Sequence, residues 1–200
     1  AVGTSLAKTE SILIAILGTF FFSSPLSVWG YASVFVGSAG LVFASQWKVS
    51  LDDKANFRSL SYGLGAGLGF ALASLWIRSA SLSLAVGPIP SAAAVLLYMV
   101  VLQSLICFLW IVLKEPEQLK LIKNNLNTCL FIGFTGVAGS VGWFTAMSLQ
   151  NAALVKTLGQ VEFIIGLLIT YFYFNERISR REYLGIALIA LSVFLIAGFI

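Results

Sequence analysis

Two glutamates lie inside long apolar segments of the sequence. Glu10 is part of AVGTSLAKTESI (residues 1–12), and Glu162 is part of ALVKTLGQVEFI (residues 153–164). A carboxylate at the centre of a bilayer costs at least ~2.5–3.5 kcal/mol, so such residues usually have a function. We expect these two to exchange protons or to contact a cationic group of a ligand. The alternative is that each glutamate is hydrogen-bonded between helices or paired with a lysine.

Three further polar residues lie close to these glutamates in the sequence. Lys156 and Gln160 are four residues apart and share one helical face, whereas Glu162 lies off that face. For Lys156, snorkelling from the end of its segment to the membrane surface is the simpler interpretation. Lys8 lies deeper in its segment. It could face a cavity and attract an anionic group, or pair with a residue that precedes this sequence.

Polar or amphipathic side chains also occur in other apolar segments, namely Tyr98, Gln103, Trp143, Thr145 and Ser148. A pocket for a small amphipathic molecule needs a mostly apolar wall with a few polar anchors. We consider these residues candidate anchors. The alternative is that each makes a hydrogen bond between helices.

Several kinds of chemistry are excluded by what the sequence lacks. Histidine is absent, and Cys107 and Cys129 have no metal-ligand spacing. This excludes Ser-His and Cys-His catalysis and histidine-ligated metals or haem. No basic stripe with interleaved aromatic residues indicates a nucleic-acid partner. We therefore expect no catalytic residue, no metal site, no cofactor and no nucleic-acid partner.

The composition indicates an integral membrane protein. Of the 200 residues, 59% are hydrophobic and only 10% are charged, whereas soluble domains carry roughly a quarter charged residues. The apolar segments are too long for barrel strands, so we expect an all-α integral membrane protein that crosses the bilayer several times. We predict that this bilayer is the cell (inner or plasma) membrane. Seven segments have the required length, at residues 1–22, 26–47, 58–78, 91–113, 126–150, 152–174 and 181–200.

Positive charge marks one side of these spans. Nine of the 12 lysines and arginines fall in three loops that seven spans place together, and they are Lys48, Lys54, Arg58, Lys114, Lys120, Lys123, Arg177, Arg180 and Arg181. The opposite loops contain Arg78 alone. The positive-inside rule makes the rich side cytoplasmic.

The first two segments repeat in the last two. At an offset of 152 residues, Glu10 aligns with Glu162, and the register continues through Ser27 with Ser179 and Tyr31 with Tyr183. Five spans separate equivalent helices, so the two copies run in opposite directions across the membrane. Inverted repeats of this kind are the architecture of many secondary transporters, with the binding site between the repeats.

These residues resemble a known family. The stretch ALVKTLGQVEFIIGLLITYFYFNERISRREYLGIALIALSVFLIAG looks like the last helix pair of EamA-like drug/metabolite transporters, and SYGLGAGLGFALASLWIRSASL resembles the opening helix of their second repeat. The resemblance implies an inverted-repeat helical bundle of ten helices. Seven of these are present, because the chain begins at Ala1 within an apolar pattern and is interpreted as an N-terminally truncated fragment.

On this basis residues 1–47 are the last two helices of the first repeat, 48–57 the inter-repeat loop and 58–200 the second repeat. The family usually has both termini in the cytoplasm, which disagrees with the charge bias.

Glycine spacing suggests where helices approach closely. Gly63/Gly67 and Gly65/Gly69 are small-xxx-small pairs that permit close helix contact. A second group, predicted to act similarly, is Gly133, Gly136, Gly139, Ser140 and Gly142. The sequence GLGAGLG lies in an apolar span without a preceding strand, which argues against a phosphate loop.

We therefore predict a secondary transporter that moves a small metabolite or drug by alternating access, as an exporter or permease. Coupled protons and the lipid bilayer are the other expected partners. The alternative is a channel or a non-transporting membrane scaffold. An intramembrane enzyme is disfavoured because histidine and intraspan aspartate are absent. A retinal photoreceptor is disfavoured because the last span has no lysine.

Overall fold

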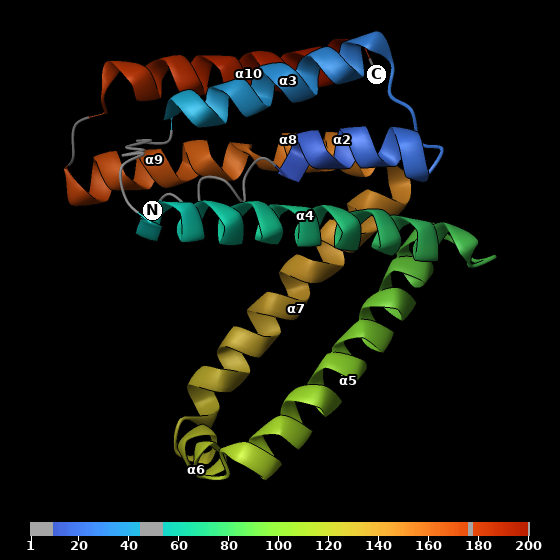
Figure 1. Ribbon diagram of the computed structural model, residues 1–200, viewed down its shortest axis with the longest axis vertical. Helices are drawn as coiled ribbons and strands as arrows, with labels where there is room; N and C mark the ends of the chain where they lie inside the picture. The colour runs from blue at the N-terminus through green and yellow to red at the C-terminus, as the bar shows by residue number, and fades with distance from the viewer. Residues whose placement is uncertain (1–9, 45–53, 176–177, 200) are drawn as a thin grey trace. The chain divides into compact units, whose positions relative to one another are not determined.

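The structure is a computed structural model that describes residues 10–44, 54–175 and 178–199. These residues are helical apart from short connections, which confirms the predicted all-α class (Figure 1). The helices are α2 (Glu10–Phe21), α3 (Val28–Ala44), α4 (Lys54–Ser83), α5 (Pro88–Lys114), α6 (Glu117–Asn124), α7 (Leu126–Leu149), α8 (Ala152–Gly159), α9 (Val161–Phe174) and α10 (Arg180–Phe199).

Four segments in the described ranges are long and apolar enough to cross a membrane. They are Pro88–Lys114, Leu126–Leu149, Ala152–Phe174 and Arg180–Gly198. The described parts of the first two predicted spans form the shorter apolar helices α2 and α3. The predicted span 58–78 lies within α4, which is not one of the four. The described helices therefore support four of the seven predicted spans by length and composition.

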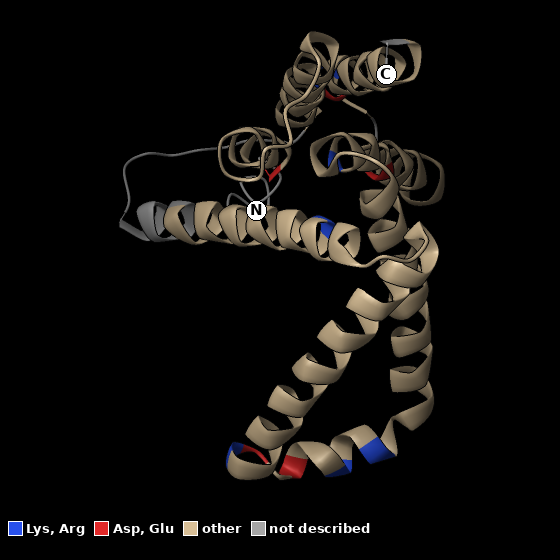
Figure 2. Ribbon diagram, turned by 90° about the vertical axis from the view of Figure 1, so that its right-hand side faces the viewer, with Lys and Arg blue, Asp and Glu red and all other residues tan. Residues whose placement is uncertain are grey.

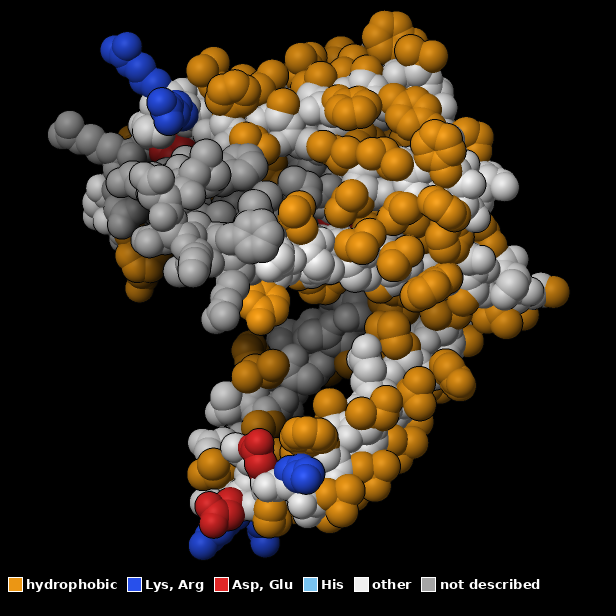
Figure 3. Space-filling model, in the orientation of Figure 1, with side chains coloured by type: hydrophobic (Ala, Val, Ile, Leu, Met, Phe, Trp, Pro, Cys, Tyr) orange, Lys and Arg blue, Asp and Glu red, His pale blue; other side chains and the backbone are white. Residues whose placement is uncertain are grey.

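Hydrophobic side chains cover much of the surface, as a membrane environment requires. Figure 3 shows them over most of the visible face, and large exposed examples are Phe20, Phe172 and Phe194. Charged residues are few along the described helices, as the blue and red segments of Figure 2 show. This surface fits the predicted integral membrane protein.

The chain divides into two compact units. One contains residues 1–76 and 150–200, and the other contains residues 77–149. The first unit groups α2 and α3 with α8, α9 and α10, although the sequence assigns these helices to different repeats. This grouping arises because α3 packs along α10 and α2 packs against α8 (Figure 1). Of the predicted inter-repeat loop, residues 48–53 lie outside the described residues and 54–57 begin α4.

A stripe of small residues allows α3 and α10 to approach closely. Its α3 members recur alternately every three and four residues and are all buried: Gly30, Ser33, Gly37, Gly40 and Ala44. A Cβ placed on Gly185 of α10 would lie 2.6 Å from the backbone nitrogen of Ala44 and 2.6 Å from the carbonyl oxygen of Gly40. Only glycine fits at this point, and membrane helices commonly use small residues in this way.

The glycines that the sequence suggested for close packing behave differently. Gly63 and Gly67 are buried in α4. In contrast, a Cβ at six others would meet no atom within 4 Å in the described part of the chain, and these are Gly65, Gly69, Gly133, Gly136, Gly139 and Gly142. The prediction of close contact within this chain is wrong for those six, because their faces of α4 and α7 pack against none of the described helices.

The second unit contains a small apolar core and a polar contact between α4 and α7. Ala92, Leu96 and Phe144 form the core between α5 and α7. The Arg78 guanidinium donates to the Met147 carbonyl oxygen at 2.6 Å. Since the last carbonyls of a helix have no partner within it, Arg78 caps the end of α7.

The predicted span 152–174 is interrupted by a tight turn at Gln160. The backbone N–H of Gln160 donates to the carbonyl of Thr157 at 3.1 Å, and the N–H of Phe163 donates to the carbonyl of Gln160 at 3.0 Å. Both bonds span three residues rather than four. Such tightened turns inside longer helices often mark hinges, and here the turn separates α8 from α9.

Candidate functional site

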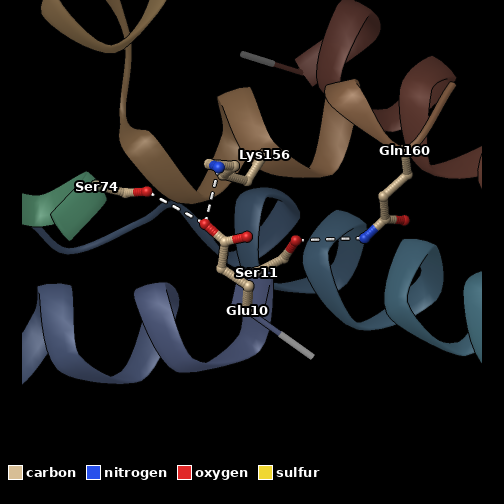
Figure 4. A network of polar contacts seen from close by, with 5 residues as sticks. All are labelled: Glu10, Ser11, Ser74, Lys156 and Gln160. Atoms are coloured by element: carbon tan, nitrogen blue, oxygen red, sulfur yellow. Dashed lines mark hydrogen bonds and ion pairs between the residues drawn. The ribbon is translucent and has the colours of Figure 1, made fainter. Parts of the chain in front are cut away.

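The clearest polar contact in the first unit is an ion pair. The Lys156 ammonium on α8 lies 2.8 Å from a carboxylate oxygen of Glu10 on α2, and the two side chains are 21% and 15% exposed. Figure 4 shows them pointing toward one another between the helices. Among the interpretations open from sequence, the structure favours a glutamate paired with a lysine. The ion pair argues against the snorkelling interpretation of Lys156, because its ammonium is held by a carboxylate between helices.

Three neutral polar residues extend this ion pair. The Ser74 hydroxyl on α4 donates to the same Glu10 oxygen at 3.2 Å. The Gln160 amide nitrogen donates to the Ser11 hydroxyl at 3.3 Å. We call Glu10, Ser11, Ser74, Lys156 and Gln160 the ion-pair cluster (Figure 4). It links three helices of one unit, namely α2, α4 and α8 with the turn that follows it.

The helical-face prediction is confirmed within this cluster. Lys156 and Gln160 contact the neighbouring residues Glu10 and Ser11 of α2, as their four-residue spacing requires. Glu162 does not share their face and is exposed in the first turn of α9. A carboxylate there is favoured by the dipole at the start of the helix.

The amide oxygen of Gln160 is buried without a hydrogen-bond partner among the described residues. The residue itself is only 6% exposed. A Cβ on Gly37 of α3 would lie 2.9 Å from this oxygen, 2.9 Å from the Ser192 hydroxyl and 2.9 Å from a Thr157 methyl. The absence of a side chain at Gly37 therefore leaves room for the Gln160 amide beside α3. An unpaired buried acceptor is costly, so this amide is suited to accept a hydrogen bond from a donor that reaches it.

The other predicted site residues do not join the ion-pair cluster in the described structure. Lys8 lies outside the described residues. Tyr98 is 75% exposed on α5, and Gln103 is exposed on the same helix. Trp143 is partly buried against the core of the second unit.

Two of the anchors proposed from sequence lie near this core. The Ser148 hydroxyl donates to the Thr145 carbonyl at 2.7 Å and lies 3.1 Å from the carbonyl of Pro88 on α5. Its contact with the Pro88 carbonyl favours, for Ser148, the alternative of a hydrogen bond between helices.

Sequence reasoning missed Ser11 and Ser74. Serine is common in membrane helices, and neither residue has a distinctive spacing. Ser11 adjoins Glu10 in the sequence, which is a weak signal, but Ser74 is brought to the Glu10 carboxylate only by the packing of α4. No group of three or more Cys, Asp or Glu residues that could hold a metal ion occurs in the described ranges. The ion-pair cluster therefore offers charged and hydrogen-bonding groups rather than a set of metal ligands.

The comparison with protein families agrees with the resemblance found in the sequence. Residues 58–198 match the EamA-like transporter family, which is part of the drug/metabolite transporter superfamily. No curated protein and no solved structure gave a match. The matched segment includes α8, which carries Lys156, and extends over more than half of the chain. Together with the apolar helices, it assigns the chain to integral multi-pass membrane transporters rather than enzymes: this protein belongs to the EamA-like transporter family.

Proposed function

We propose that the protein is a secondary transporter that moves a small metabolite or drug by alternating access, with the ion-pair cluster at its working site. The observation that carries this proposal is the Lys156–Glu10 ion pair, which is partly buried in an apolar assembly. Burying charge is costly unless it is paired. In membrane helices such residues typically mark substrate or ion pathways.

An inverted repeat is supported by how equivalent residues act. Ser27 precedes α3 and accepts from the backbone N–H of Gly30 at 3.0 Å. Its partner at offset 152, Ser179, precedes α10 and accepts from the N–H of Glu182 at 3.3 Å. Both serines therefore cap their helices through the residue three positions later.

The buried faces of these two helices follow the same offset. The described buried residues of α10 are Glu182, Gly185, Ile189 and Ser192. Subtracting 152 from each number gives residues of α3 that are all buried as well, namely Gly30, Ser33, Gly37 and Gly40. We infer that α3 and α10 are equivalent helices of two repeats that pack against one another.

The ion pair then connects the two repeats, because Glu10 lies in the predicted first repeat and Lys156 in the second. A proton or a cationic substrate group at Glu10 would weaken its attraction for Lys156. The tight turn at Gln160 lies one helical turn beyond Lys156 and lets α8 and α9 change their relative direction. We propose that breaking and remaking this contact accompanies the exchange between the two access states. Glu162 is a second candidate for proton exchange.

Counterflow in proteoliposomes tests this proposal. The full-length protein is screened against small metabolites and drugs, and the transported compound is measured at several pH values in Glu10→Gln, Lys156→Gln and Glu162→Gln. We expect saturable counterflow that is reduced in the first two variants and loses its pH dependence in Glu10→Gln. Glu117→Gln is the matched control, because Glu117 is an exposed glutamate of α6.

Three outcomes contradict the proposal in different ways. Flux that does not saturate and shows no counterflow indicates a channel, and no flux for any compound favours a scaffold. Saturable transport with unchanged pH dependence in both Glu10→Gln and Glu162→Gln supports a carrier but removes both carboxylates from its coupling.

A further inference from the structure

Helix α6 connects two helices that are long and apolar enough to cross a membrane. α5 ends at Lys114 and α7 begins at Leu126, so the 11 residues between them remain close to one membrane surface. Sequence reasoning treated residues 114–123 as a loop, but Glu117–Asn124 is helical. A short helix held at this position must lie at the boundary between lipid and water.

The side chains of α6 suit that boundary. Leu119 and Ile122 are three residues apart and share one helical face, whereas Leu121 lies off this face. Leu119 and Ile122 are 38% and 40% exposed and Leu121 is 55% exposed, so no described helix fully covers these side chains. Apolar residues on one face and lysines beside them are the pattern of helices that lie in the membrane surface.

The charges of α6 are separated along its length. Glu117 lies in the first turn, where the helix dipole stabilises it. The preceding Glu115 accepts a hydrogen bond from Gln118 at 3.2 Å. Lys120 and Lys123 follow with no acidic residue up to the end of the helix, and both are exposed. The second half of α6 therefore presents positive charge beside its apolar face.

We propose that α6 lies in the lipid headgroup layer and binds anionic headgroups through Lys120 and Lys123. Leu119 and Ile122 enter the upper acyl region, which holds the two lysines at the depth of the phosphates. Lysines held near a membrane surface are attracted to anionic headgroups. This surface is separate from the ion-pair cluster and does not depend on which substrate is transported.

Site-specific fluorescence measures the depth of α6. Cys107 and Cys129 are first replaced by alanine, and an environment-sensitive probe is attached to Leu119→Cys or, as a matched position on the opposite side of α6, to Asn124→Cys. The full chain is reconstituted in vesicles of phosphatidylcholine alone or with phosphatidylglycerol. We expect the probe at position 119 to be quenched by lipids labelled near the headgroup and the probe at 124 to be quenched less. Equal accessibility of both probes to an aqueous quencher would overturn the proposal.

Lipid selectivity tests the role of the lysines. The relative association of spin-labelled phosphatidylglycerol and phosphatidylcholine is measured from quenching of the probe at position 119. Since each surface lysine contributes a factor of about five, Lys120→Gln with Lys123→Gln should lower the preference for phosphatidylglycerol by about 25-fold. Arg180→Gln with Arg181→Gln removes the same charge at the start of α10 and should leave this local preference unchanged.

Salt provides a second measurement that requires no lysine substitution. Raising the salt concentration from 0.1 M to 1 M shortens the screening length from about 10 Å to about 3 Å. We expect the preference for phosphatidylglycerol at position 119 to disappear while the depth of the probe stays the same. A preference that is absent at low salt, or that survives both the salt and the lysine substitutions, would overturn the assignment of anionic headgroups.

Discussion

The ammonium of Lys156 and the carboxylate of Glu10 lie 2.8 Å apart on helices from opposite ends of the sequence. A contact of this kind can hold a tertiary arrangement, serve transport, or do both. Measurements of stability and of transport separate these roles, because a structural contact affects both whereas a coupling contact also changes the pH dependence of transport.

The stability of the ion pair is accessible through a double-mutant cycle. Glu10→Gln and Lys156→Gln should each lower the free energy of unfolding by about 1–3 kcal/mol, since each removes one charge of a partly buried ion pair. The double variant should lose less than the sum, with a coupling of about 0.5–3 kcal/mol. Thermal unfolding in detergent measures these values, with Glu117→Gln as the control. Strict additivity would show that the two side chains do not interact.

The close approach of α3 and α10 predicts a large effect for one methyl group. Gly185→Ala places a Cβ 2.6 Å from the Gly40 carbonyl oxygen, and the helices must separate to accommodate it. We expect a loss of about 1–3 kcal/mol in unfolding free energy, as for other overpacked positions. Gly198→Ala is the matched control on α10, because a Cβ at Gly198 would meet nothing within 4 Å. Equal stability of the two variants would contradict the packing of α3 on α10.

The helix caps test whether α3 and α10 are equivalent. Ser27→Ala and Ser179→Ala each remove a side chain that accepts from the backbone three residues later. Each should cost about 0.5–2 kcal/mol of unfolding free energy. Hydrogen exchange of the first turn of α3 or α10, measured by mass spectrometry, should rise only in the helix that loses its cap. Ser83→Ala serves as the control, since the Ser83 hydroxyl is exposed and, within the described residues, donates to the Ala80 carbonyl of its own helix. Unchanged exchange in both first turns would remove the capping role.

The sequence predicted those features that depend on local composition and spacing. Apolar length identified the helices α5, α7 and α10, and the four-residue spacing of Lys156 and Gln160 put them on one face. The repeat alignment paired Ser27 with Ser179, and the structure finds the same capping role for both. Each of these features is encoded within about one helical segment.

Features that depend on which helices meet were not predictable in this way. The GLGAGLG segment appeared to be the best packing motif, yet Gly65 and Gly69 approach no described neighbour. The small residues of α3 follow an equally regular spacing without forming a glycine-rich run. Ser74 reaches Glu10 only because α4 packs beside α2. Glu10 and Glu162 align in sequence, but the residues available to pair with them differ. Glu10 pairs with Lys156, and the residue that aligns with Lys156 at the offset of 152 is Thr4. The first repeat therefore has no lysine at the position that would correspond to the partner of Glu10.

The position of Gly37 connects the packing of α3 with the ion-pair cluster. A Cβ at this position would lie 2.9 Å from the Gln160 amide oxygen and 2.9 Å from the Ser192 hydroxyl. Gly37→Ala should therefore displace the Gln160 side chain, weaken its bond to Ser11 and lower transport more than Gly139→Ala, whose Cβ would meet nothing within 4 Å.

Adding Gln160→Ala to Gly37→Ala provides the decisive comparison. The shortened side chain removes one of the close contacts, so the double variant should regain part of the unfolding free energy lost in Gly37→Ala. It should not regain transport if the Gln160 amide takes part in the working site, because that amide is then absent. Counterflow and thermal unfolding are measured for the unaltered protein, Gly37→Ala, Gly139→Ala and the double variant, and together they distinguish the outcomes. Recovery of both stability and transport would show that Gln160 only fills space beside α3, and recovery of neither would show that the contact with Gln160 does not cause the effect of the added methyl.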